Sequence, residues 1–319
     1  MRTTRALRAL LPPWAHERIG PSPAEPSYVA GDGFPAEMSV NWSGRHPELR
    51  VLFDSLGHDV IPPGDSGFGT RRLERVHETF TPRTGRPSPA PLWHSMAWRP
   101  PSDVVHKSYF GLYPWPHAQR EQAVAEAMAR LGMSTAWDDA RRRVETVDGE
   151  REIEFFAVDL ADEAAARVKV YYRNHGADLT SVNRVAAVAS RHDPDRAAAA
   201  YRTLAGTRTD AGEAALTCLA FRSGLDRAAE STTYLRLPDL AGDDREAVER
   251  TATLLLREGV DPGRFRTLAA SLAPGPLSES RGLLELVSYR AAGRAGDVTT
   301  YFRFPVYPPP PPLSPVDLA

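Results

Sequence analysis

The sequence contains only two lysines, and each stands close to a tyrosine. Of its 39 basic residues 37 are arginine, and the exceptions, Lys107 and Lys169, occur in H-K-S-Y-F and R-V-K-V-Y-Y. Side chains two positions apart on a strand share a face. Each segment therefore presents an ammonium group beside the ring of Tyr109 or Tyr171. An ammonium can bind an anion, whereas the face of a tyrosine ring can stabilise a cation.

These tyrosines belong to a repeat of about sixty residues. Tyr109, Tyr171, Tyr234 and Tyr301 are 62, 63 and 67 residues apart, and each lies in an alternating segment that predicts a β-strand. A second strand-like segment precedes each one across a short polar turn, which predicts a hairpin. The paired segments are 92–98 with 104–112, 153–160 with 167–173, 215–221 with 231–237, and 283–290 with 298–304; a further pair, 34–42 with 49–54, precedes them.

Helices are predicted between the hairpins. Apolar residues at helical spacing indicate helices over 119–131 and 195–204, the second preceded by Asp193 and Pro194 as N-cap and first-turn proline. Asp243 and Glu246 resemble a capping box for a helix ending at Glu258, and a further helix is expected over 262–272. The stretch 55–91 is rich in Pro, Gly and Ser and predicts no clear element.

Five consecutive hairpins predict an α+β fold built on a ten-stranded antiparallel β-barrel with helices outside. Hairpins make antiparallel neighbours, which argues against a parallel eight-stranded barrel, and ten strands can enclose a ligand. We expect one domain over 34–307, an N-terminal segment over 1–33 and a proline-rich tail over 308–319. Five consecutive prolines favour a stiff polyproline II conformation in the tail, with an SH3-type ligand as the alternative.

The polar strand faces are expected to line the barrel, because the outer helices need the apolar faces. Four basic side chains on these faces suit a diphosphate: Arg50, Lys107, Arg167 and Lys169. The tyrosines can stabilise a cation and exclude water, so the lining fits an allylic diphosphate that ionises. Glu37 can accept the proton that an aromatic ring loses when it is alkylated. The acidic runs at 138–139 and 243–244 lack the third spaced carboxylate of metal-dependent prenyl chemistry, so no metal is expected.

The composition excludes several classes of function. The net charge is −2, so no basic excess attracts nucleic acid or an anionic membrane. No apolar run is long enough for a signal sequence or a membrane span. The single cysteine, Cys218, excludes an intrachain disulfide. We therefore expect a cytoplasmic protein, a monomer or homodimer, whose partners are small molecules.

Four motifs resemble those of the dimethylallyltryptophan synthase family of aromatic prenyltransferases, and the resemblance covers roughly 34–307. They are P-A-E-M-S-V-N-W, R-V-L-F-D, H-K-S-Y-F and R-V-K-V-Y-Y. The resemblance implies the barrel of αββα repeats, dimethylallyl diphosphate as co-substrate, tryptophan or another indole as acceptor, and no metal or other cofactor. It further implies that Glu37 binds the indole N–H, that the four basic residues bind diphosphate and that the four tyrosines shield the allyl cation.

The sequence also departs from the family pattern. Thr232 stands where many members have glutamine, and Arg99 stands near the position of a catalytic lysine in many fungal members. Arg303 is placed in the lumen by repeat phase alone. The chain is shorter than the fungal enzymes, which points to a bacterial branch. The same barrel could serve a phenol prenyltransferase or a cyclase, or a non-catalytic protein that binds an aromatic metabolite.

Overall fold

The computed structural model describes residues 12–23, 25, 27–44, 46–57, 67–80, 89–99, 101, 104–162, 166–212, 215–304 and 306–307. The proline-rich tail, for which a polyproline II conformation is expected, lies outside the described residues.

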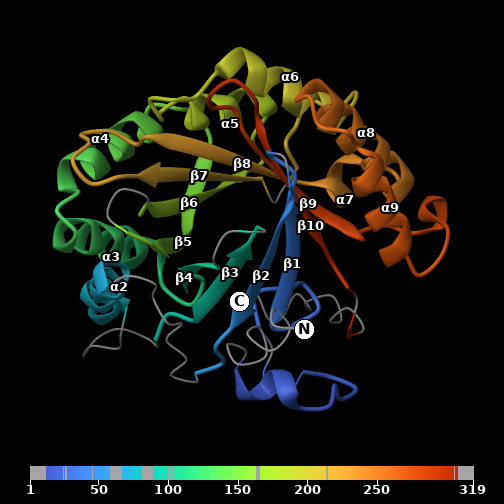
Figure 1. Cartoon of the computed structure of the whole chain (residues 1–319). Coiled ribbons are helices and arrows are strands. Elements are labelled where there is room, and N and C mark those ends of the chain that lie inside the picture. Colours follow the sequence, from blue (N-terminus) through green and yellow to red (C-terminus); the bar gives the residue numbers. More distant parts are fainter. Residues whose placement is uncertain are drawn as a thin grey trace, which may run out of the picture.

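Ten strands of the described chain form a closed antiparallel barrel, in which each strand pairs with its neighbours in sequence. The barrel closes where β10 pairs with β1, with Tyr301 opposite Ser39; Figure 1 shows these two strands, red and blue, side by side. The strands are β1 (Ala36–Asn41), β2 (Glu48–Asp54), β3 (Leu92–Trp98), β4 (Val105–Gly111), β5 (Glu150–Leu160), β6 (Val168–His175), β7 (Leu216–Phe221), β8 (Glu230–Arg236), β9 (Leu284–Arg290) and β10 (Asp297–Phe302). The predicted fold class and all five hairpins are confirmed.

The helices lie around the outside of the barrel (Figure 1). They are α2 (Gly67–Phe80), α3 (His117–Arg130), α4 (Ser134–Glu145), α5 (Leu179–Ala186), α6 (Pro194–Ala205), α7 (Leu237–Leu240), α8 (Asp244–Arg257) and α9 (Gly263–Leu272), with short 3-10 turns at Pro13–His16 and Leu277–Glu279. The predicted caps are present, because Asp193 accepts from the backbone N–H of Arg196 at 3.1 Å and Asp243 from that of Glu246 at 2.7 Å. None of the described helices is long and apolar enough to cross a membrane.

The apolar strand faces point outward and pack against the helices, as predicted. Val168 and Val170 of β6 are fully buried in one such layer. In the same layer Phe80 of α2 stacks on Phe110 of β4 with ring centroids 4.5 Å apart. Close approach of α2 to β5 requires a glycine, since a Cβ at Gly69 would lie 2.8 Å from the backbone of Leu160. The polar faces are thereby left to line the interior.

Two β-bulges interrupt the regular alternation inside the barrel. In the pairing of β5 with β6, Ile153 and Phe155 oppose consecutive residues of β6, so Glu154 is an extra residue. In the pairing of β9 with β10, Phe302 lies opposite Leu284 and Tyr301 opposite Leu286, so Glu285 is extra. A bulge redirects side chains near the extra residue. Each of these bulges inserts a glutamate.

Candidate active site

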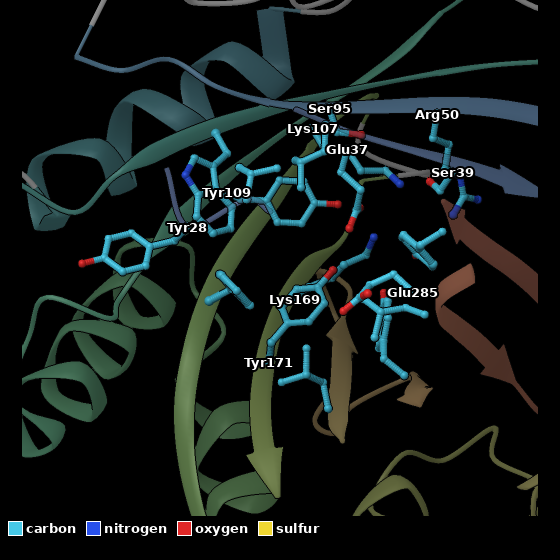
Figure 2. A pocket seen from close by; sticks show the side chains of 18 of the residues that line it. Tyr28, Glu37, Ser39, Arg50, Ser95, Lys107, Tyr109, Lys169, Tyr171 and Glu285 are labelled. Atoms are coloured by element: carbon cyan, nitrogen blue, oxygen red, sulfur yellow. The ribbon is translucent and has the colours of Figure 1, made fainter. Parts of the chain in front are cut away.

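A cavity of about 260 Å³ lies inside the barrel. A smaller pocket of about 70 Å³ adjoins it and shares some of the same lining residues. Eight of the predicted site residues line the larger cavity: Glu37, Arg50, Lys107, Tyr109, Lys169, Tyr171, Tyr234 and Tyr301. Arg167 and Thr232 line the smaller pocket, which also includes Arg50, Lys107 and Lys169. Figure 2 shows Glu37, Lys107, Lys169 and Tyr171 among the side chains that surround the larger cavity.

The smaller pocket gathers basic side chains together with three carboxylates, Glu230 and Asp297 in its lining and Asp159 beside it. Asp159 of β5 accepts from Arg167 Nε at 2.8 Å and lies 3.3 Å from Lys169 Nζ. Burial alone would raise the pKa of Asp159, but the charges of Lys169 and Arg167 outweigh it and hold the pKa well below its usual range. Burial and the charge of Lys169 lower the pKa of Lys107. Five basic side chains line the pocket against these three carboxylates, which leaves the excess of positive charge that an anion site requires.

Arg290 also lines the smaller pocket, and sequence reasoning did not select it. Its Nη1 donates to Glu230 at 2.7 Å, and the same carboxylate accepts from Arg167 at 3.2 Å. It lies two residues beyond Ser288, another residue of this lining, so strand alternation could have placed it there. No lysine or tyrosine stands two residues away from it on the same strand face, however, because its neighbour Tyr289 belongs to the other face, and it stands at the end of its strand.

The four repeat tyrosines form one continuous row across β4, β6, β8 and β10. Ring centroids are 6.1 Å apart between Tyr109 and Tyr171, 5.9 Å between Tyr171 and Tyr234, and 5.8 Å between Tyr234 and Tyr301. Burial raises the pKa of each phenol, so all four remain neutral near neutral pH. The row presents aromatic rings to the cavity beside the basic pocket, which is a suitable surface for a carbocation.

Glu37 faces the cavity from β1, two residues before Ser39. Burial, together with the negative charge of Glu285 on β9, raises its pKa to about 8. In the empty cavity near neutral pH, Glu37 is therefore mostly protonated. A ligand that brings a hydrogen-bond donor or a positive charge favours the ionised form.

The part of the cavity remote from the smaller pocket carries two further ion pairs that the sequence did not predict. Arg173 donates to the bulge residue Glu154, whose other oxygen accepts from the Tyr113 hydroxyl at 3.2 Å. Arg236 donates to the other bulge residue, Glu285, at 2.6 Å. Strand alternation cannot identify such glutamates, because a bulge reverses the faces beyond it. We call this part the acceptor end, and it includes Glu37.

A residue that precedes the barrel closes one side of the acceptor end. Tyr28 stacks on Tyr113 with centroids 5.2 Å apart and lines the cavity with Val29. Ser27 anchors this segment by donating to Asp54 of β2 at 2.6 Å. Part of the segment 1–33, which the sequence prediction set apart from the barrel, therefore contributes to the cavity wall.

Arg99 and Arg303 do not line either pocket. Because β3 ends at Trp98, Arg99 leaves the sheet; it donates to Ser43 O and to Asn41 Oδ1, the latter at 2.9 Å, and lies 3.6 Å from Glu48. Arg303 follows the last residue of β10, beyond the bulge, and its guanidinium lies near Gly31. Arg303 is thus separated from the two pockets, whereas Arg99 is linked to Arg50 through Glu48, which accepts from Arg50 Nε at 2.6 Å.

A closed ten-stranded antiparallel barrel with helices outside defines the class: this is the fold of the ABBA prenyltransferases. No family model matches the chain. Among solved structures, it matches 6-dimethylallyltryptophan synthase from Micromonospora olivasterospora in complex with DMASPP and Trp at 27% identity and a TM-score of 0.84, covering 98% of this chain and 94% of that one. The chain is thus a structural relative of the bacterial dimethylallyltryptophan synthase-type prenyltransferases.

Two further bacterial matches support this relationship. The 5-dimethylallyl tryptophan synthase from Streptomyces coelicolor, also in complex with DMASPP and Trp, is 25% identical with a TM-score of 0.80 and covers 98% of this chain and 90% of that one. PriB in a binary complex with product diphosphate is 26% identical with a TM-score of 0.80, covering 97% and 91% of the respective chains. AnaPT from Neosartorya fischeri, at 14% identity, a TM-score of 0.65 and coverage of 86% and 79%, shares the fold.

Proposed function

We propose that the protein transfers a dimethylallyl group from dimethylallyl diphosphate to the indole ring of tryptophan or a tryptophan-derived acceptor, without a metal. The observation that carries this proposal is the continuous row of tyrosines, which joins the basic pocket to the acceptor end that holds Glu37. Relatives at 25 to 27% identity were crystallised with DMASPP and Trp, which supports the same pair of substrates.

The basic pocket binds the diphosphate. Five basic side chains face it: Arg50, Lys107, Arg167, Lys169 and Arg290. When the C1–O bond of the donor breaks, the electron pair leaves with the diphosphate, and these fixed cations stabilise the charge that develops on it. Asp159 keeps Arg167 and Lys169 in position before the donor arrives. This is the task that a metal ion performs in other prenyl-transferring enzymes.

The row of tyrosines shields the dimethylallyl cation. The ring faces stabilise positive charge, and their close succession excludes water that would capture the cation. Because burial keeps the four phenols neutral, none is available as a phenolate that the cation could alkylate. The cation therefore persists until an aromatic carbon of the acceptor attacks C1.

Glu37 aligns the acceptor through the indole N–H. As the new C–C bond forms, positive charge spreads over the indole, and the carboxylate stabilises it and takes up the proton that the ring releases. Thr232 lies in the diphosphate pocket in this arrangement. Arg99 and Arg303 act outside the lumen, where Arg99 fixes the β1–β2 connection through Ser43 and Asn41.

The direct test is an incubation of the purified protein with dimethylallyl diphosphate and a panel of tryptophan, tryptophan-containing cyclic dipeptides, simple indoles and phenols. Mass spectrometry should show one added dimethylallyl group on an indole acceptor. A product formed only on phenols would assign the barrel to the alternative phenol class. Donor binding without any product would favour a non-catalytic barrel, although such a protein has no need for five basic residues around one pocket.

A further inference from the structure

The acceptor end holds a carboxylate, Glu285, that the proposed reaction does not use. Glu285 is the extra residue of the bulge between β9 and β10, and both it and the next residue, Leu286, line the cavity. In a regular strand, neighbouring side chains point to opposite faces. The bulge therefore adds a carboxylate to a cavity wall in which Leu286 and Tyr301 already face inward. Only β10 lies between β9 and β1 in the barrel, and Figure 2 shows Glu285 and Glu37 facing the same cavity.

One oxygen of Glu285 has a partner and the other has none. Oε1 accepts from Arg236 Nε at 2.6 Å, whereas Oε2 is buried and has no hydrogen-bond partner among the described residues. Arg236 compensates the charge of Glu285 only in part, because its Nη1 also donates to a second carboxylate, Asp239, at 2.7 Å. A buried carboxylate oxygen without a donor is costly. A ligand that supplied a charged donor at this position would remove that cost.

The charges around the acceptor end are complementary to a cation. Its carboxylates are Glu37, Glu154 and Glu285, with Asp239 behind Arg236, and its basic side chains are Arg173 and Arg236. Arg173 is already paired with Glu154, and Arg236 serves two carboxylates. This end therefore lacks positive charge, in contrast to the diphosphate pocket at the other end of the tyrosine row.

We propose that Glu285 binds the ammonium group of an amino-acid acceptor and thereby selects indoles that carry a free amine. The proposal rests on the proposed function and adds to it the residue that recognises the amine of the acceptor. The ion pair with Arg236 holds the Glu285 carboxyl group in the cavity wall before any ligand binds. Glu37, which lies on β1 with only β10 between it and β9, is left for the neutral indole N–H. One molecule with an indole at one end and an ammonium at the other can satisfy both carboxylates.

Binding of the ammonium also acts on Glu37. The charge of Glu285 is one of the two causes that raise the Glu37 pKa, so its neutralisation by an ammonium lowers that pKa and favours the ionised carboxylate. The base is then ionised most readily when an amino-acid acceptor is in place. The other charged or titratable groups that line this cavity are Tyr28, Arg50 of β2, Lys107 and Tyr109 of β4, Tyr113, Lys169, Tyr171 and Arg173 of β6, Tyr234 and Arg236 of β8, and Tyr301 of β10.

The test compares two acceptors that differ only in the amine: L-tryptophan and indole-3-propionic acid. The variant Glu285→Gln removes the charge but keeps the size and an acceptor oxygen for Arg236. Its kcat/KM for tryptophan should fall by about ten- to a hundredfold, mainly through KM, as expected for a lost hydrogen bond to a charged group. Its kcat/KM for indole-3-propionic acid should not fall, because no ammonium is present, and a rise near neutral pH would follow from the lowered pKa of Glu37.

Asp239→Asn is the matched control, because Asp239 shares Arg236 but does not line the cavity. It should leave the preference for tryptophan unchanged. If it reduces that preference as much as Glu285→Gln does, the effect comes from Arg236 and the proposal is overturned. An equal loss on both acceptors in Glu285→Gln, or no loss on either, overturns it as well. Glu285→Asp, which keeps the charge, should retain part of the preference if the glutamine variant does not fold.

Binding measurements separate this inference from the proposed function. Isothermal titration of tryptophan and of indole-3-propionic acid into wild type and Glu285→Gln needs no turnover. If no acceptor is prenylated, the proposed function fails, while tighter binding of tryptophan that is lost in the variant still supports Glu285 as the ammonium site. If products form but an amine-free acceptor is bound and used better than tryptophan, the proposed function stands and the role of Glu285 is wrong.

Discussion

The pH dependence of the reaction should report the ionisation of Glu37. Burial and the charge of Glu285 raise the pKa of this carboxyl to about 8. About a tenth of the free enzyme then carries an ionised Glu37 at pH 7, and about nine-tenths at pH 9. Since kcat/KM follows the ionisation of the free enzyme, it should rise about tenfold over that interval with an acceptor that does not itself titrate there, such as indole.

Glu37→Gln should remove this rise and lower the rate. The amide keeps the shape and can still accept a hydrogen bond, but it cannot take up a proton, so kcat/KM should fall by roughly a hundred- to ten-thousandfold and become flat between about pH 7 and pH 9. Glu285→Gln should instead move the rise to lower pH, because it removes the negative charge that helps to raise the Glu37 pKa.

The free energy of unfolding should also depend on pH through the ionisation of Glu37. The pKa of Glu37 is higher in the folded protein than its ordinary value of 4.5, so the folded state holds this proton more tightly than the unfolded state. This group therefore reduces the free energy of unfolding as the pH rises from about 4.5 to about 8, and adds no further change above that range. Relative to wild type, Glu37→Gln should gain stability across that window.

Initial rates between about pH 6 and pH 10, with circular dichroism and thermal melts at each pH, test both effects. If the rise in kcat/KM persists in Glu37→Gln, another group causes it, with Lys107 and Lys169 as the candidates in the lumen. Near wild-type turnover in the variant would show that Glu37 neither aligns the acceptor nor takes up its proton. A glutamine variant that does not fold would assign Glu37 a structural role.

Three further predictions concern the diphosphate pocket. Lys169→Ala should weaken binding of a non-hydrolysable dimethylallyl diphosphate analogue by about 1.5 to 3 kcal/mol, measured by titration; unchanged affinity would contradict the assignment. Transfer should continue in EDTA, because protein cations stabilise the leaving group, and activity that is lost in chelator and restored by magnesium would contradict this. Asp159→Asn should lower the free energy of unfolding by about 3 to 5 kcal/mol without diphosphate, because Arg167 and Lys169 lose their counter-charge. Added inorganic diphosphate should then raise the melting temperature more in this variant than in wild type.

The barrel could be predicted from the sequence because each hairpin has a clear local pattern, two alternating segments joined by a short polar turn. Alternation identifies strands and faces, and the lysines and tyrosines fall on the lumen side at a repeated phase, as in Lys169 and Tyr171 of β6. The sequence pattern identifies fewer of the helices. Residues 134–145 form α4 although few of them are apolar, because Trp137 and Val144 suffice to fix it to the barrel. The helix over 67–80 was not predicted, because the surrounding stretch is rich in proline and glycine, which disfavour helices.

Glu37 of the acceptor end was predicted, but the two bulge glutamates of this end were not, because they depend on departures from regular strands. Strand alternation assumes an unbroken register, and the bulges at Glu154 and Glu285 break it. The same limit explains Arg303, which repeat phase assigns to the lumen although the strand ends before it. Arg99 was selected by its position near a family lysine, but its strand ends one residue earlier. Long-range pairing decides these placements, and a single sequence does not record it.

The distribution of charge along the lumen gives the proposed reaction a direction. Ionisation of an allylic diphosphate produces two opposite charges at one place, and their recombination competes with transfer. In the proposed reaction the diphosphate stays with basic side chains such as Arg167 and Arg290, whereas Glu37 and Glu285 lie at the other end of the tyrosine row. The resulting field draws the allyl cation away from its leaving group and toward the acceptor. Because the row of rings is continuous, the cation meets aromatic faces rather than water along this path, and transfer is favoured over return.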